Sequence, residues 1–104
     1  MRQNAARANA LVKAMANKWR FLILCHVADG EKSVNELQSR IGLSQSSLSQ
    51  HLAVLRRDNL VKTRRQAKSI LYSLASDEAA TMMVTLNDLF RRDVKAGTAQ
   101  RSAP

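Results

Sequence analysis

Two short amphipathic helices separated by only two residues constrain the fold of this 104-residue chain most strongly. The first begins at Ser33, which has the spacing of a capping box with Glu36. Gly42 closes it, and Ser44 is a second N-cap that opens a helix with leucines at helical spacing. A short helix, a glycine-containing turn and a second helix are the signature of a helix-turn-helix, whose second helix enters the major groove of DNA.

Two helices are predicted before this pair. Residues 4–15 are rich in alanine, contain no Gly or Pro, and place their apolar residues on one helical face. Residues 18–28 are apolar nearly all round, which predicts a buried helix, and Asp29-Gly30 ends it with turn-forming residues.

The pattern changes its period after the pair. β-prone runs at 60–64 and 69–74 predict a β-hairpin, and Ser76 is a third N-cap that opens a long last helix. The expected fold is therefore mainly α with a β-hairpin wing: a winged helix-turn-helix of four helices, the hairpin and a fifth helix. We expect one domain over 1–96 and a disordered tail over 97–104.

The exposed face of the helix after Ser44 predicts contacts with DNA. It carries serine and glutamine and no acid, whereas a surface helix usually carries Glu and Lys, which are better helix formers. Gln50 could pair bidentately with an adenine, and the amino end of the helix could hold a phosphate through its free amides. An ordinary solvated surface is the alternative. The candidate residues are Ser44, Gln45, Ser46, Ser47, Ser49, Gln50 and His51.

Basic residues cluster at the predicted hairpin. The chain has 17 Lys+Arg against 8 Asp+Glu, a formal net charge of +9, which favours nucleic acid or an anionic membrane surface as partner. A cationic β-ribbon can contact phosphates or place an arginine in the minor groove, but it can also be an edge strand that resists aggregation. The candidate contacts with double-stranded DNA added here are Arg56, Arg64, Arg65, Gln66 and Lys68.

Four stretches of the chain, at 19–25, 33–37, 43–52 and 64–67, resemble the ArsR/SmtB family of bacterial repressors. The stretch at 43–52, Leu-Ser-Gln-Ser-Ser-Leu-Ser-Gln-His-Leu, is long and much more specific than a generic helix-turn-helix. The chain is similar above all to the subgroup that regulates haemolysin, biofilm and sulfide genes.

The resemblance implies a homodimer built by the first and last helices, an imperfect palindrome as binding site, and an inducer that changes the affinity for DNA. Two-fold protein symmetry would then match two-fold operator symmetry. Apolar residues of the two terminal helices agree with such an interface, although they could instead only cover the core of one chain. These candidate interface residues are Leu11, Met15, Met82, Met83, Leu86 and Phe90.

The effector itself is not predicted, and neither a cofactor nor a metal site is expected. Family members that sense metals use a Cys-x-Cys in the third helix or Asp and His pairs in the last one. The matching positions here carry no such set, and the lone His51 is a poor metal candidate. They are Glu36, Leu37 and Gln38 in the third helix, and Ser76, Glu78, Leu89 and Arg92 in the last.

Cys25 is the only cysteine of the chain. The resemblance implies a sensing pair of which Cys25 matches the first member, but the second position falls near Arg91, where there is no thiol. A disulfide or tetrasulfide switch within the chain is therefore excluded. Cys25 lies in the most apolar helix, where a free cysteine is usually a small buried hydrophobe. A redox role for this single thiol stays open as the alternative.

Other classes of function fit less well. The chain has no Gly-rich phosphate loop and no supported nucleophile–base set, so we do not expect an enzyme. A protein-interaction module would need dimerisation but no recognition helix. An activator that displaces another DNA-bound protein is a further alternative.

Nothing in the sequence predicts a membrane protein. The longest apolar stretch, at 21–27, is too short to span a bilayer, and the amino terminus lacks a secretory signal. We therefore expect a cytoplasmic protein, associated with the nucleoid when bound to DNA.

Overall fold

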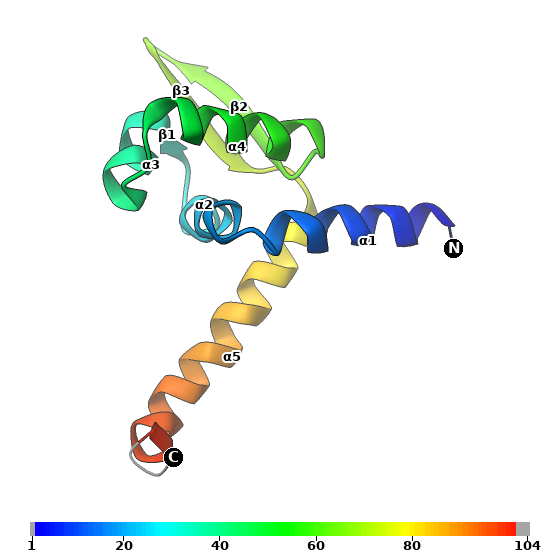
Figure 1. Ribbon diagram of the computed structural model, residues 1–104, viewed down its shortest axis with the longest axis vertical. Coiled ribbons are helices and arrows are strands. Elements are labelled where there is room, and N and C mark those ends of the chain that lie inside the picture. Colours follow the sequence, from blue (N-terminus) through cyan, green and yellow to red (C-terminus); the bar gives the residue numbers. More distant parts are fainter. Residues whose placement is uncertain (1, 102–104) are drawn as a thin grey trace.

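The computed structural model describes residues 2–101, and side chains from residue 4 to residue 90. A head of three helices and a small sheet carries two projecting helices, one at each end of the chain (Figure 1). In chain order the elements are α1 (Arg2–Met15), α2 (Lys18–Ala28), β1 (Lys32–Ser33), α3 (Val34–Ile41), α4 (Gln45–Arg57), β2 (Val61–Gln66), β3 (Ser69–Leu74) and α5 (Asp77–Arg101).

The sheet differs from the sequence prediction in having a third strand. It is antiparallel with the order β1-β3-β2. Lys32 and Ser33 of β1 pair with Tyr72 and Leu71 of β3, so the predicted two-stranded hairpin is incomplete. Two residues are too few for an alternating pattern, and β1 is defined by the partner strand beside it rather than by its own sequence. The added strand anchors the hairpin to the helices.

The core lies where α2 meets the helix-turn-helix. Ile23 and Leu24 of α2 are fully buried, as are Leu37 of α3 and three leucines of α4. Because α4 places Leu48, Leu52 and Leu55 in this core, its opposite face must point outward.

The turn between α3 and α4 is built as the sequence predicts. The Ser33 hydroxyl accepts a hydrogen bond from the amide of Glu36 at 3.1 Å, and the Glu36 carboxylate accepts one from the amide of Ser33 at 3.0 Å. Gly42 ends α3 in the left-handed region, with φ of 86°. The Ser44 hydroxyl then accepts from the amide of Ser47 at 3.2 Å and caps α4.

Replacing Gly42 tests how much this turn depends on a left-handed residue. A Cβ at Gly42 would meet no atom within 4 Å, so the cost of Gly42→Ala is backbone strain alone. We expect a loss of about 1 kcal/mol in the free energy of unfolding, measured by urea denaturation. Gly42→Asn should lose less, because asparagine tolerates this region; an equal loss for both variants would contradict the explanation.

The last helix is longer than the sequence predicts. Helix α5 continues through Gly97 to Arg101, into the segment 97–104 that is predicted to be a disordered tail. A single glycine costs about 1 kcal/mol in a helix and does not end one by itself. The end of that tail, 102–104, lies outside the described residues, as does Met1 at the start of the predicted domain.

Candidate nucleic-acid interface

The outward face of α4 is polar. Gln45, Ser46, Ser49 and Gln50 are exposed along it, opposite the three buried leucines. Acidic side chains are absent from α4, so this face presents hydroxyls and amides without charge repulsion toward phosphate. A helix with such a face fits the major groove and can meet base edges there.

Three other candidates on or beside α4 are placed differently. Ser44 is exposed, but its hydroxyl is already engaged as the N-cap. Ser47 and His51 are half-buried at the edge of the polar face. Burial and the nearby Arg20 guanidinium lower the pKa of His51, which favours a neutral imidazole at pH 7. His51 is therefore a hydrogen-bonding group there rather than a cation.

The wing extends beyond α4 at one side of the head (Figure 1). Strands β2 and β3 form its two edges, and Arg65, Gln66 and Lys68 are exposed near its tip. Arg56 is exposed at the end of α4. These cations and the polar face of α4 form one candidate interface, in which the helix can meet bases and the wing can meet phosphates.

Arg64 has a partner inside the protein that the sequence does not reveal. Its guanidinium donates two hydrogen bonds of 2.7 Å to the two carboxylate oxygens of Glu31, in the loop after α2. It also donates to the amide oxygen of Gln66 at 3.2 Å. The guanidinium lowers the pKa of Glu31, so the pair is charged at neutral pH. Arg64 thus braces the wing against the loop that precedes β1.

Removing the Glu31 carboxylate should release Arg64 for DNA. We expect Glu31→Gln to raise affinity for duplex DNA a few-fold at low salt, because a competing carboxylate near the phosphates is removed. The slope of log affinity against log salt should steepen by about 0.9, the value for one added phosphate contact. Anisotropy titrations at several salt concentrations measure both quantities. A weaker affinity in Glu31→Gln would show instead that the brace is needed to hold the wing.

The candidate dimer residues do not share one environment. Leu11 and Met83 are buried within the single chain, with exposed fractions of 7% and 5%. Met15, Met82 and Leu86 are half-buried, and only Phe90 is fully exposed, at 60%. For Leu11 and Met83, covering the core of one chain is therefore what the structure shows.

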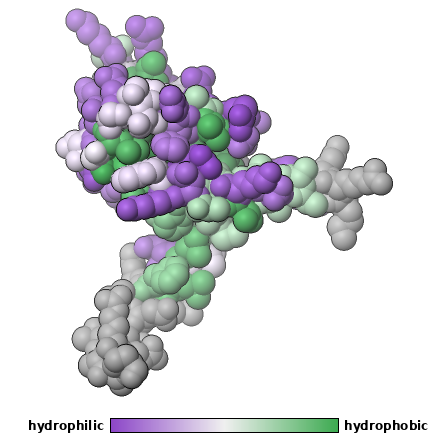
Figure 2. All heavy atoms as spheres, in the orientation of Figure 1, coloured by the Kyte–Doolittle hydropathy of each residue, from purple (hydrophilic) through white to green (hydrophobic). Residues whose placement is uncertain are grey.

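Exposed apolar side chains continue along α5 beyond the core. Leu89 lies beside Phe90 and is 49% exposed. Figure 2 shows apolar residues on the described part of this helix, in contrast to the mostly hydrophilic head. Such a surface on a projecting helix is typical of a site covered by another protein chain.

The groups that could sense an effector are few among the described residues. Cys25 is half-buried against the core, and burial raises the pKa of its thiol, so a thiolate is disfavoured. The described residues contain no group of three or more His, Cys, Asp or Glu side chains able to hold a metal ion. None of the described helices is long and apolar enough to cross a membrane.

The fold and this face define a winged helix-turn-helix, and comparison with known proteins agrees. The family model for bacterial regulatory proteins of the arsR family matches residues 17–63. The transcriptional activator HlyU of Vibrio cholerae is 53% identical over 90 residues, covering 86% of this chain and 83% of HlyU. A biofilm growth-associated repressor of Agrobacterium fabrum is 41% identical over 90 residues, covering 86% of this chain and 77% of the repressor.

Solved structures give the same result. Reduced HlyU from Vibrio cholerae superposes with a TM-score of 0.81 over 86% of this chain and 95% of HlyU, at 53% identity. The repressor BigR from Xylella fastidiosa gives 0.77 over 86% and 92%, at 38% identity. The chain belongs to the ArsR family of bacterial regulatory proteins. It is a DNA-binding transcriptional regulator, which confirms the fold and the family that the sequence predicts.

Proposed function

We propose that this protein is a homodimeric repressor that binds an imperfect palindrome in double-stranded DNA. The polar, acid-free face of α4 is the observation that carries the proposal, because an exposed helix with hydroxyls and amides suits the reading of base edges. Gln50 is placed to pair with an adenine, and Ser46 and Ser49 lie on the same face.

The remaining candidates then divide into positioning and steering contacts. Arg56, Arg65 and Lys68 would contact phosphates and set the register of the helix in the groove. The amino end of α4, at Ser44 and Gln45, would hold a phosphate through its amides. Arg64 would stiffen the wing while it is bound to Glu31.

Dimerisation through α5 would place two such faces on one side of the DNA. Phe90 and Leu89 are too exposed for a single chain to leave in water without cost, and a two-fold partner would cover both copies at once. Two-fold symmetry gives two half-sites one helical turn apart or a multiple of it. The domain of this dimer would extend over about residues 1–96, as the sequence predicts.

An activator is the second candidate, and one comparison favours it. HlyU, at 53% identity, is named a transcriptional activator, whereas the relatives from Agrobacterium and Xylella are named repressors. A protein bound to a palindrome can block transcription, or it can raise transcription by displacing another DNA-bound protein. Both outcomes use the same interface, in the cytoplasm and on the nucleoid.

Selection of binding sites from random DNA tests the proposal for any operator sequence. The full chain would be used to enrich duplexes from a random library, and the DNA upstream of its own gene would be footprinted. We expect an enriched palindrome that matches a protected segment. Reporter expression from that segment, with and without the gene, then separates repression from activation. A library that enriches no common sequence would overturn the proposal.

A further inference from the structure

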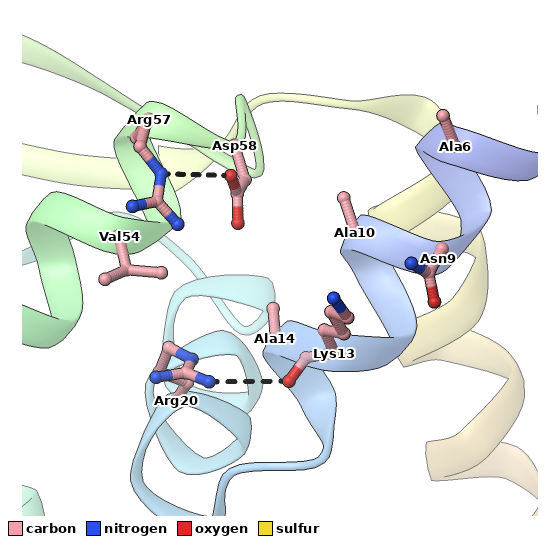
Figure 3. Close-up of a pocket in the computed structure, with 9 residues that line it drawn as sticks. All are labelled: Ala6, Asn9, Ala10, Lys13, Ala14, Arg20, Val54, Arg57 and Asp58. Atoms are coloured by element: carbon pink, nitrogen blue, oxygen red, sulfur yellow. Dashed lines mark hydrogen bonds and ion pairs between the residues drawn. The ribbon is translucent and has the colours of Figure 1, made fainter. Parts of the chain in front are cut away.

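A cavity of about 330 Å³ lies between α1, the start of α2 and the end of α4 (Figure 3). It is separate from the candidate DNA contacts, none of which lines it. Its volume is at the lower end of the range of about 300–1,000 Å³ found for small-molecule sites. The cavity therefore has room for a small molecule.

Small side chains on α1 create this space. Ala6, Ala10 and Ala14 follow one another at intervals of four residues, so they lie on one face of the helix and point into the cavity (Figure 3). A larger residue at the middle position would fill much of the volume. The space is thus a property of this alanine row.

Positive charges surround the space. Lys13, Arg20 and Arg57 line it from three different helices, and Asp58 is the only carboxylate among the lining residues. Arg57 donates to Asp58 at 3.3 Å, which leaves two of the three cations without a carboxylate partner in the cavity. A small cavity with such an excess of cations favours an anion.

Arg20 is the least satisfied of the three cations. Its Nε atom is buried and has no hydrogen-bond partner within the part of the chain that the structure describes. One Nη atom donates to the Lys13 carbonyl oxygen at 3.4 Å, which is long for a hydrogen bond. A guanidinium held in this way lacks acceptors, and its strongest acceptors are the oxygens of a carboxylate or phosphate.

We propose that this cavity binds a small molecule through an oxyanion group, with Arg20, Arg57 and Lys13 as its cationic ligands. Asp58 adds a requirement, because a carboxylate repels a bare anion but accepts from a hydroxyl. The ligand should therefore carry a hydroxyl donor beside its oxyanion oxygens. Monobasic phosphate has both groups, whereas sulfate at neutral pH has only acceptor oxygens.

The position of the cavity connects a ligand to DNA binding. Its walls include Lys13 of α1, Arg20 of α2 and Arg57 of α4, so a bound anion would contact the recognition helix and two helices behind it. A ligand that favours one arrangement of these helices must change DNA affinity, and DNA must change ligand affinity by the same factor. The site would thus be an effector site, which goes beyond the proposed function.

Titration with inorganic phosphate tests the binding step without DNA. Calorimetry or amide NMR of the full chain would be carried out at pH 7 and constant ionic strength, with sulfate as the matched anion. We expect saturable binding of phosphate that is tighter than that of sulfate. Arg57→Gln, at an exposed side chain, should weaken it at least about tenfold by removing a charged hydrogen bond, and Ala10→Met should abolish it by filling the space.

Lys18→Gln is the matched control, because Lys18 is an exposed cation on α2 outside the cavity. It should leave phosphate binding unchanged. Equal shifts with phosphate and sulfate, or equal losses in Lys18→Gln and Arg57→Gln, would mean general screening of charge and would overturn the proposal.

Competition with DNA distinguishes a small-molecule site from a contact with the DNA backbone. If the cavity takes a DNA phosphate, Arg57→Gln should lower the salt slope of DNA binding by about 0.9, and that outcome would overturn the small-molecule site. We expect an unchanged slope, and a phosphate-dependent change of DNA affinity in the wild type that Ala10→Met lacks. If phosphate binds but leaves DNA affinity unchanged, the effector role is wrong.

Discussion

Gln50→Glu should abolish preferential binding to the selected palindrome. The substitution replaces a candidate donor–acceptor pair for adenine by a carboxylate in the middle of the polar face of α4. Loss of one bidentate base contact costs about 1–3 kcal/mol per half-site, and repulsion from the DNA adds to it. Since a dimer loses the contact twice, we expect operator affinity to fall at least about 100-fold. Fluorescence anisotropy with the selected duplex measures this loss.

The control for this variant is Asn87→Asp, which makes the same amide-to-carboxylate change at an exposed residue of α5. It should lower operator affinity by little, through the change in net charge alone. Both variants should unfold at the wild-type urea midpoint, because both side chains are exposed. An operator affinity that is equal in Gln50→Glu and Asn87→Asp would mean that α4 does not read the sequence.

Phe90→Asp should convert the protein into a monomer and weaken its binding to the palindrome. Phe90 is 60% exposed in the single chain, so its replacement costs little folding stability, whereas two charges would meet across a two-fold interface. Linking two modules can raise affinity by about 10²–10⁴-fold, so separating them should cost at least about 100-fold on the full site. Light scattering gives the mass, and anisotropy gives the affinity.

Val84→Asp is the matched control for dimerisation. Val84 is an exposed apolar residue of the same helix, 58% exposed, and the helical period places it on the side opposite to Leu86 and Phe90. It should stay dimeric and keep operator affinity within a few-fold. Affinity of Phe90→Asp for a single half-site should equal that of the wild-type monomer. A Phe90→Asp variant that remains a dimer would contradict the proposed interface.

Local signals in the sequence predict most of the helix-turn-helix. The capping box at Ser33, the left-handed Gly42 and the cap at Ser44 each depend on residues within three positions of one another, so the chain shows them directly. The leucine spacing of α4 likewise determines which face is buried, and therefore which face is available to DNA.

Features that depend on distant partners could not be predicted in this way. Strand β1 exists because β3 lies beside it, and Glu31 meets Arg64 across 33 positions of sequence. The division of the apolar terminal residues is also a tertiary property. Met83 and Phe90 belong to the same periodic pattern, yet only Met83 reaches the core of its own chain.

The specificity ratio of the wild-type protein is the most direct measurement of whether α4 reads DNA sequence. It compares affinity for the selected palindrome with affinity for a scrambled duplex of the same composition, at one salt concentration near physiological. A sequence-reading regulator should bind the palindrome at least about 10³-fold more tightly. Equal affinity for the two duplexes, with the same steep salt dependence, would reduce the protein to a non-specific polycation and contradict the role given to the α4 face.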